Sequence, residues 1–129
     1  MSSEKTAKRQ SILIIEPNAQ FREELCNFLL SAGYENVAAV ESLSEALDKI
    51  RQSAFEVVVI DAGSPHVGGP RLAQDLAQLS PGMKVILMIK AEDQQMWNQI
   101  AAQVGEVCFL IKTTFAQNLL YLLEEPAQP

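Results

Sequence analysis

The sequence contains few of the side chains on which metal centres and disulfide scaffolds depend. Its 129 residues include two cysteines and a single histidine, His66. Cys26 and Cys108 are too few for a disulfide framework, and neither lies in a metal-ligand spacing. One histidine cannot form a histidine-rich metal site. We therefore expect reduced thiols and a cytoplasmic location.

Membrane segments and excess positive charge are also missing. No apolar run approaches the roughly 18 residues that a membrane-spanning helix needs. The first ten residues are polar and lack the apolar core of a signal peptide. Ten lysines and arginines stand against 16 aspartates and glutamates, which gives a net charge of −6. This balance argues against direct binding to nucleic acid or to a membrane surface.

The residues that are present suit one globular domain. Hydrophobic residues make up 48% of the chain, and its length of 129 residues matches a single domain. We expect a disordered N-terminal segment over residues 1–10, a folded domain over 11–124, and a tail or the start of a linker over 125–129. Whether the chain is complete or part of a larger protein stays open.

Apolar runs alternate strictly with amphipathic segments along the chain. Five runs have the composition of buried strands, over residues 11–15, 37–40, 56–61, 84–89 and 107–111. Helices are expected after Asn18, from the capping-box sequence 42–45, after Pro70, over 92–103 and after Thr114. This alternation predicts an α/β fold in which helices cover both faces of a five-stranded parallel sheet.

The apolar spacing also predicts which side of each helix faces the sheet. Gly33 has the position of a glycine that ends the first helix. In the fourth helix we expect Met96, Ile100 and Ala101 to point inward and Trp97 to be partly exposed. The last helix is apolar around most of its circumference, because Phe115 is followed by a continuous apolar run over 119–123.

Four ionisable residues lie at the carboxyl ends of predicted strands. They are Glu16, Asp61, Lys90 and Lys112. An open parallel sheet binds its ligands at the carboxyl ends of its strands, so these side chains form the candidate site.

Four segments together resemble a receiver domain of the bacterial two-component response regulators. They are Ile12–Asn18, Val57–Asp61, Pro65–Gly69 and Leu110–Lys112. The resemblance implies a doubly wound (βα)5 fold with the flavodoxin-like strand order 2-1-3-4-5. It also implies a role in phosphorelay signalling rather than an enzyme with a substrate of its own.

The resemblance assigns a role to each strand-end residue. Asp61 would accept a phosphoryl group from a histidine kinase or phosphotransfer protein, and Lys112 would contact the phosphoryl oxygens. Glu16, Asp61 and the backbone carbonyl of Gly63 would be ligands of Mg²⁺. His66 lies in the matching loop and is expected to be an exposed residue rather than a catalytic base.

Three positions depart from the family pattern. Pro17 replaces a second acid, Lys90 replaces a serine or threonine, and Thr113 replaces a proline that commonly follows a cis bond. A cis bond before Thr113 would cost about 3 kcal/mol, so we expect a trans bond or a strained loop. The two acids and two lysines of this site give a net charge of zero. The usual site of the family has three acids and one lysine, and its net negative charge suits a divalent cation.

We therefore hypothesise that Lys90 pairs with Asp61 in place of the ion and that Mg²⁺ binding is weak or absent. Lys90 would then either stabilise a phosphoryl group or disable Asp61 as a nucleophile.

Two rival functions stay open. The first is a pseudo-receiver, an interaction module that never takes a phosphoryl group. The second is an enzyme or flavin binder on the same fold, although the chain lacks a glycine-rich phosphate loop after its first strand. The excess apolar surface of the last helix suggests a homodimer or an output partner on the 92–123 face, unless Leu120 and Tyr121 pack under neighbouring loops.

Overall fold

The computed structural model describes residues 9–63, 82–104 and 107–124, which form two compact units, 1–60 and 61–129. The predicted N-terminal segment, the Pro65–Gly69 motif with His66, the helix after Pro70 and the tail over 125–129 lie outside the described residues, entirely or in large part.

Five strands form one parallel sheet in the order β2-β1-β3-β4-β5. They are β1 (Ile12–Ile15), β2 (Val37–Val40), β3 (Val57–Asp61), β4 (Lys84–Ile89) and β5 (Cys108–Ile111). In the first unit β1 pairs in parallel with β2 and β3, and in the second β4 pairs in parallel with β5. The predicted doubly wound fold and its strand order are confirmed, and the strand bounds agree with the apolar runs to within a residue.

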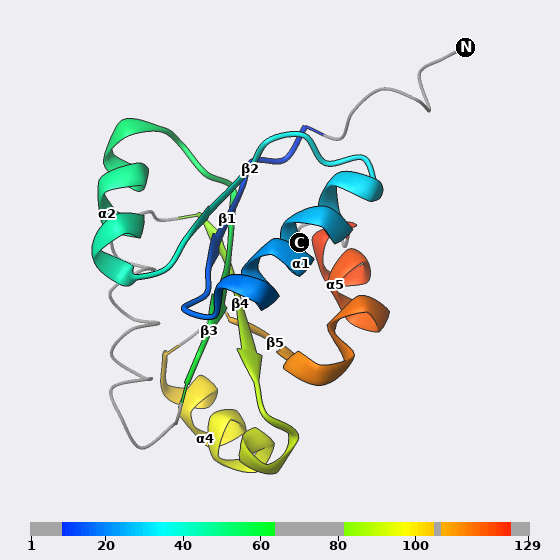
Figure 1. The fold of residues 1–129 in the computed structure, drawn as a ribbon. Helices are drawn as coiled ribbons and strands as arrows, with labels where there is room; N and C mark the ends of the chain where they lie inside the picture. The colour runs from blue at the N-terminus through cyan, green and yellow to red at the C-terminus, as the bar shows by residue number, and fades with distance from the viewer. Residues whose placement is uncertain (1–8, 64–81, 105–106, 125–129) are drawn as a thin grey trace. The chain divides into compact units, whose positions relative to one another are not determined.

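In the first unit, two helices flank a strand that has no exposed face. All four residues of β1 are buried, at 0–4% exposure. The helices α1 (Ala19–Ser31) and α2 (Leu43–Gln52) lie on opposite sides of the β1–β2 pair (Figure 1). A strand covered on both faces must be apolar at every position, which explains why β1 is a continuous run rather than an alternating one.

The predicted caps of α1 and α2 are confirmed. The Asn18 Oδ1 atom accepts a hydrogen bond from the Phe21 amide at 2.8 Å, and Ser42 Oγ accepts one from the Glu45 amide at 3.2 Å. The Glu45 carboxylate accepts in return from the Glu41 amide, one residue before the cap. Gly33, just past the end of α1, has a φ of 103°, a conformation that favours glycine.

In the second unit, α5 (Phe115–Glu124) carries a narrow buried stripe. Phe115, Leu119 and Leu123 are buried, whereas Tyr121 is 68% exposed. The Lys84 ammonium donates a hydrogen bond to the Leu122 carbonyl in the last turn of the helix. A cation at this end of a helix satisfies a carbonyl and complements the helix dipole, so Lys84 attaches the end of α5 to the start of β4.

The rotation of α4 (Gln94–Val104) about its axis differs from the prediction. Met96 is 38% exposed and Trp97 is fully buried, so the expectations for both residues were wrong. The Trp97 ring packs against Phe109 of β5 with centroids 6.4 Å apart, and its indole N–H has no acceptor among the described residues. The helix begins after a tighter 3₁₀ turn, Ala91–Asp93, which changes the direction in which the following side chains point. The indole ring of Trp97 is also larger than the Met96 side chain, so its burial removes more apolar surface from water.

Replacing Met96 by alanine tests this rotation of α4. Because the side chain is 38% exposed, we expect the free energy of unfolding to change by less than about 0.5 kcal/mol. Urea denaturation measures the change. A loss of about 2 kcal/mol or more, which is typical of a buried methionine, would show that Met96 faces the core.

None of the helices in the described part of the chain is both long and apolar enough to cross a membrane.

Candidate functional site

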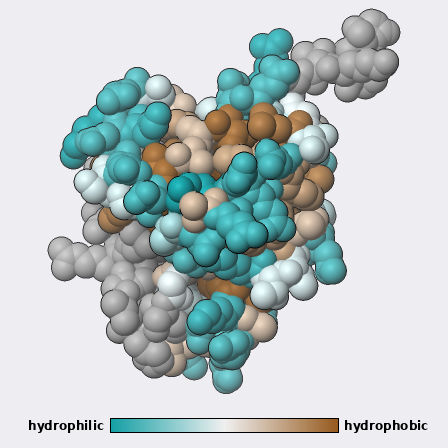
Figure 2. All heavy atoms as spheres, in the orientation of Figure 1, coloured by the Kyte–Doolittle hydropathy of each residue, from teal (hydrophilic) through white to brown (hydrophobic). Residues whose placement is uncertain are grey.

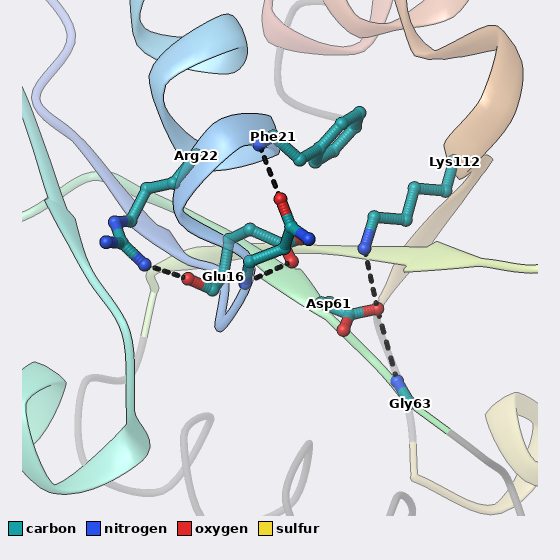
Figure 3. A network of polar contacts seen from close by, with 7 residues as sticks. Glu16, Phe21, Arg22, Asp61, Gly63 and Lys112 are labelled. Atoms are coloured by element: carbon teal, nitrogen blue, oxygen red, sulfur yellow. Dashed lines mark hydrogen bonds and ion pairs between the residues drawn. The ribbon is translucent and has the colours of Figure 1, made fainter.

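Two of the predicted site residues form an ion pair in the second unit. Asp61 is the last residue of β3, and Lys112 directly follows β5. The Lys112 Nζ atom lies 3.6 Å from Asp61 Oδ1, and each side chain is about a quarter exposed (Figure 3). The Ala62 amide donates to the Met88 carbonyl, which holds the end of β3 beside β4. The site therefore combines a nucleophilic carboxylate with a fixed cation.

The backbone after Asp61 turns back toward the same carboxylate. The Gly63 amide donates to Asp61 Oδ1 at 3.4 Å. Gly63 has a φ of 67°, a conformation that side chains other than glycine rarely adopt. Asp61 Oδ1 thus faces both the ammonium and an amide, whereas Oδ2 accepts no hydrogen bond from the residues that the structure describes.

Lys90 is not part of this ion pair. It follows β4 and precedes the 3₁₀ turn Ala91–Asp93, and its side chain is exposed. Its ammonium pairs with no other described residue, so the hypothesised Lys90–Asp61 pair is absent from the described site. Lys112 already neutralises the Asp61 carboxylate. Removing the hydrated Lys90 ammonium from water would cost more free energy than its attraction to the neutralised pair would contribute.

Glu16 lies in the first unit, directly after β1, and its side chain is buried at 1% exposure. The Glu16 Oε2 atom accepts a hydrogen bond from the Asn18 amide at 3.0 Å. The Glu16 amide donates to the Val40 carbonyl at 3.0 Å, which extends the β1–β2 ladder by one residue. Pro17 is exposed and contributes neither a carboxylate nor a backbone N–H.

Sequence reasoning missed the contribution of Arg22 to this loop. Its Nη1 atom donates to the Glu16 carbonyl at 2.7 Å and lies 3.3 Å from the Pro17 carbonyl. The only sequence signal is an arginine in the first turns of a helix that follows a strand-end acid.

Burial raises the pKa of the nearby Cys26 thiol, while Arg22 lowers it and Glu23 raises it further. The thiol is therefore protonated at neutral pH.

The residues present do not fit a tightly held Mg²⁺. Among the described residues, no group of three or more His, Cys, Asp or Glu side chains could hold a metal ion. Pro17 supplies no oxygen ligand from its side chain, and Asp61 already faces the Lys112 ammonium. Mg²⁺ depends on several oxygen ligands in near-octahedral order, and Pro17 removes one that the family pattern supplies.

The backbone from Ile111 to Thr114 departs from the family pattern as predicted. The described residues contain no cis peptide bond, so the bond before Thr113 is trans. Residues Lys112–Thr114 form a 3₁₀ turn that leads into α5. Lys112 is thus held between the end of β5 and the start of a helix.

A carboxylate at the end of the central strand of a 2-1-3-4-5 sheet, paired with a lysine after the last strand, is the arrangement expected of a receiver domain. Residues 12–124 match the family model described as the response regulator receiver domain. The chain therefore belongs to this family, which is that of two-component systems.

Known proteins agree with this assignment. The chain is 28% identical over 109 residues to the chemotaxis protein CheY of Bacillus subtilis, covering 84% of this chain and 90% of that protein. It is 31% identical to the response regulator protein FleR of Pseudomonas aeruginosa over 90% of this chain, but spans 24% of FleR.

Solved structures share the fold. The structure of CheY4 from Vibrio cholerae has a TM-score of 0.76 at 22% identity, covering 91% of this chain and 98% of that one. The receiver domain of a sensor histidine kinase from Pseudomonas aeruginosa, solved with a magnesium ion in its active-site cleft, has a TM-score of 0.72 at 21% identity, covering 91% of this chain and 96% of that one.

Proposed function

We propose that the chain accepts a phosphoryl group on Asp61 from the phosphohistidine of a histidine kinase or phosphotransfer protein. The observation that carries the proposal is the 3.6 Å ion pair between Lys112 Nζ and Asp61 Oδ1. The pair places a cation beside a strand-end carboxylate, where it can also interact with the negative charge of a phosphoryl group after transfer. The transferred phosphoryl group stays on Asp61 of this chain, so the protein is not an enzyme with a separate substrate.

The transfer step uses the free oxygen of the carboxylate. Asp61 Oδ2 attacks the phosphorus of the donor, a P–O bond forms, and the P–N bond to the imidazole breaks. The leaving imidazole takes up a proton from water and departs as a neutral ring, and Asp61 becomes an acyl phosphate. Lys112 and the Gly63 amide then interact with the phosphoryl oxygens, whose negative charge replaces that of the carboxylate.

Mg²⁺ is expected to assist this step only weakly. When bound, the ion would neutralise charge on the phosphoryl group, with Glu16, Asp61 and the Gly63 carbonyl as ligands. Because Pro17 removes one ligand, stimulation by Mg²⁺ should not saturate in the micromolar range.

Intact-protein mass after incubation with a small acyl-phosphate donor, with and without Mg²⁺, tests both the transfer and this dependence. A phosphoryl mass gain that saturates at micromolar Mg²⁺ would contradict the weak site.

The output is expected to be a change in protein–protein contacts on the 92–123 face. Residue Tyr121 of α5 is 68% exposed, and Met96 of α4 is 38% exposed, so large apolar side chains remain in solvent on both helices. Packing of Tyr121 under a neighbouring loop, the alternative from the sequence, does not agree with this exposure. A homodimer or an output partner would cover these side chains.

A pseudo-receiver is the second candidate, and two observations favour it. Pro17 stands where a second acid would lie, and Lys90 stands exposed where a hydroxyl would report on phosphorylation. A chain that gains no phosphoryl mass from either the small donor or its kinase would act as a constitutive interaction module.

A further inference from the structure

The loop between β1 and α1 is held from outside by one arginine. Arg22 Nη1 lies 2.7 Å from the Glu16 carbonyl oxygen (Figure 3). It also lies 3.3 Å from the Pro17 carbonyl oxygen. The first contact has the length of a strong charge-assisted hydrogen bond. Two consecutive carbonyls thus point at a single guanidinium nitrogen, which limits the rotation of the peptide unit that follows Glu16.

This loop needs such an external donor because of Pro17. Proline has no backbone N–H, so residue 17 cannot help to close the turn by donating to it. Other local bonds run from the Asn18 amide to Glu16 Oε2, from the Phe21 amide to Asn18 Oδ1 and from the Arg22 amide to the Asn18 carbonyl. Arg22 completes this network over residues 16–22 and joins the first turns of α1 to the end of β1.

The Glu16 carboxylate depends on the geometry of this loop. It is buried at 1% exposure, and the burial of a charged group is costly unless hydrogen bonds and opposite charge compensate it. The Asn18 amide donates a hydrogen bond to this carboxylate. The peptide units on either side of Pro17 set the direction in which the Asn18 N–H points. The delocalised guanidinium of Arg22 supplies positive charge one carbonyl group away.

We propose that Arg22 is a positioning residue, which fixes the orientation of the Glu16 carboxylate through the carbonyls of the loop. The proposal rests on the proposed function, in which the family pattern makes Glu16 an acid of the phosphoacceptor site. Arg22 acts through backbone atoms of the loop between β1 and α1.

An Arg22→Gln variant tests the proposal by NMR at the Asn18 amide. In the unmodified protein, this amide proton should be protected from exchange by its hydrogen bond to Glu16 Oε2. In Arg22→Gln we expect exchange at Asn18 to be faster by about tenfold or more. Arg22→Lys should restore part of the protection, because it keeps the charge but not the planar fork.

Arg51→Gln is the matched control. Arg51 is an exposed arginine on α2 that pairs with Asp48 at 3.5 Å, so its loss removes one charge and no loop contact. It should leave the Asn18 signal unchanged. Equal Asn18 exchange in Arg22→Gln and Arg51→Gln, with only stability differing, would overturn the proposal.

The rate of phosphoryl mass gain separates this proposal from the proposed function. We expect Arg22→Gln to slow the gain about threefold to tenfold relative to Arg51→Gln. A chain that gains no mass at all would contradict the proposed function and leave the Asn18 result to decide the role of Arg22. An altered Asn18 signal with an unchanged rate would overturn the assignment of Arg22 to the phosphoacceptor site.

Discussion

Replacing Asp61 by asparagine should abolish the gain of phosphoryl mass from a small acyl-phosphate donor. The amide is nearly the same size as the carboxylate but is not the nucleophile that forms an acyl phosphate. The fold should survive, because the pair with Lys112 is partly exposed at 26% and 24% and such pairs contribute about 1 kcal/mol or less. The result would therefore report on chemistry rather than on unfolding.

Asp93→Asn is the matched control for this variant. Asp93 lies in the 3₁₀ turn before α4, in the same unit as Asp61, and its replacement makes the same chemical change. We expect Asp93→Asn to gain mass at the rate of the unmodified protein. A gain of equal size in Asp61→Asn would place the acceptor on another residue.

Replacing Lys112 by glutamine should slow phosphorylation of Asp61 about a hundredfold. Loss of one preorganised charge or donor from such a site typically costs a factor of this order. The Lys112 ammonium lies 3.6 Å from the carboxylate, so it is in place before the donor arrives. Initial rates of mass gain at a fixed donor concentration measure the effect.

Lys90→Gln distinguishes the two lysines. Because the Lys90 side chain is exposed and has no ion pair with a described residue, we expect a rate within about threefold of the unmodified protein. A larger loss in Lys90→Gln than in Lys112→Gln would show that Lys90 supplies the electrostatic stabilisation, as charge counting along the sequence had suggested.

Much of the fold was predictable because its signals are local. Asn18 and Ser42 begin helices with side chains that cap nearby amides, and these bonds form over three residues. The strands of the sheet are short apolar runs that alternate with amphipathic segments along the sequence. The strand-end positions of Asp61 and Lys112 follow from the same alternation, so their approach was predictable as well.

The errors concern contacts that depend on tertiary structure. Met96 and Trp97 are neighbours in sequence, and only the preceding 3₁₀ turn and the ring of Phe109 decide which of them is buried. Counting charges placed two lysines at the site but could not show which one reaches Asp61. Arg22 binds backbone carbonyls, and no pattern of side chains reveals that kind of contact.

Chemical trapping of the phosphorylated residue tests the central claim most directly. After incubation with the donor, borohydride reduction converts an aspartyl phosphate to homoserine, and peptide mass spectrometry locates the change. We predict homoserine at position 61 in the unmodified protein, with the same conversion in Asp93→Asn. Homoserine at any other acid, or none after treatment with both the small donor and a cognate kinase, would contradict the assignment of Asp61 as the phosphoacceptor.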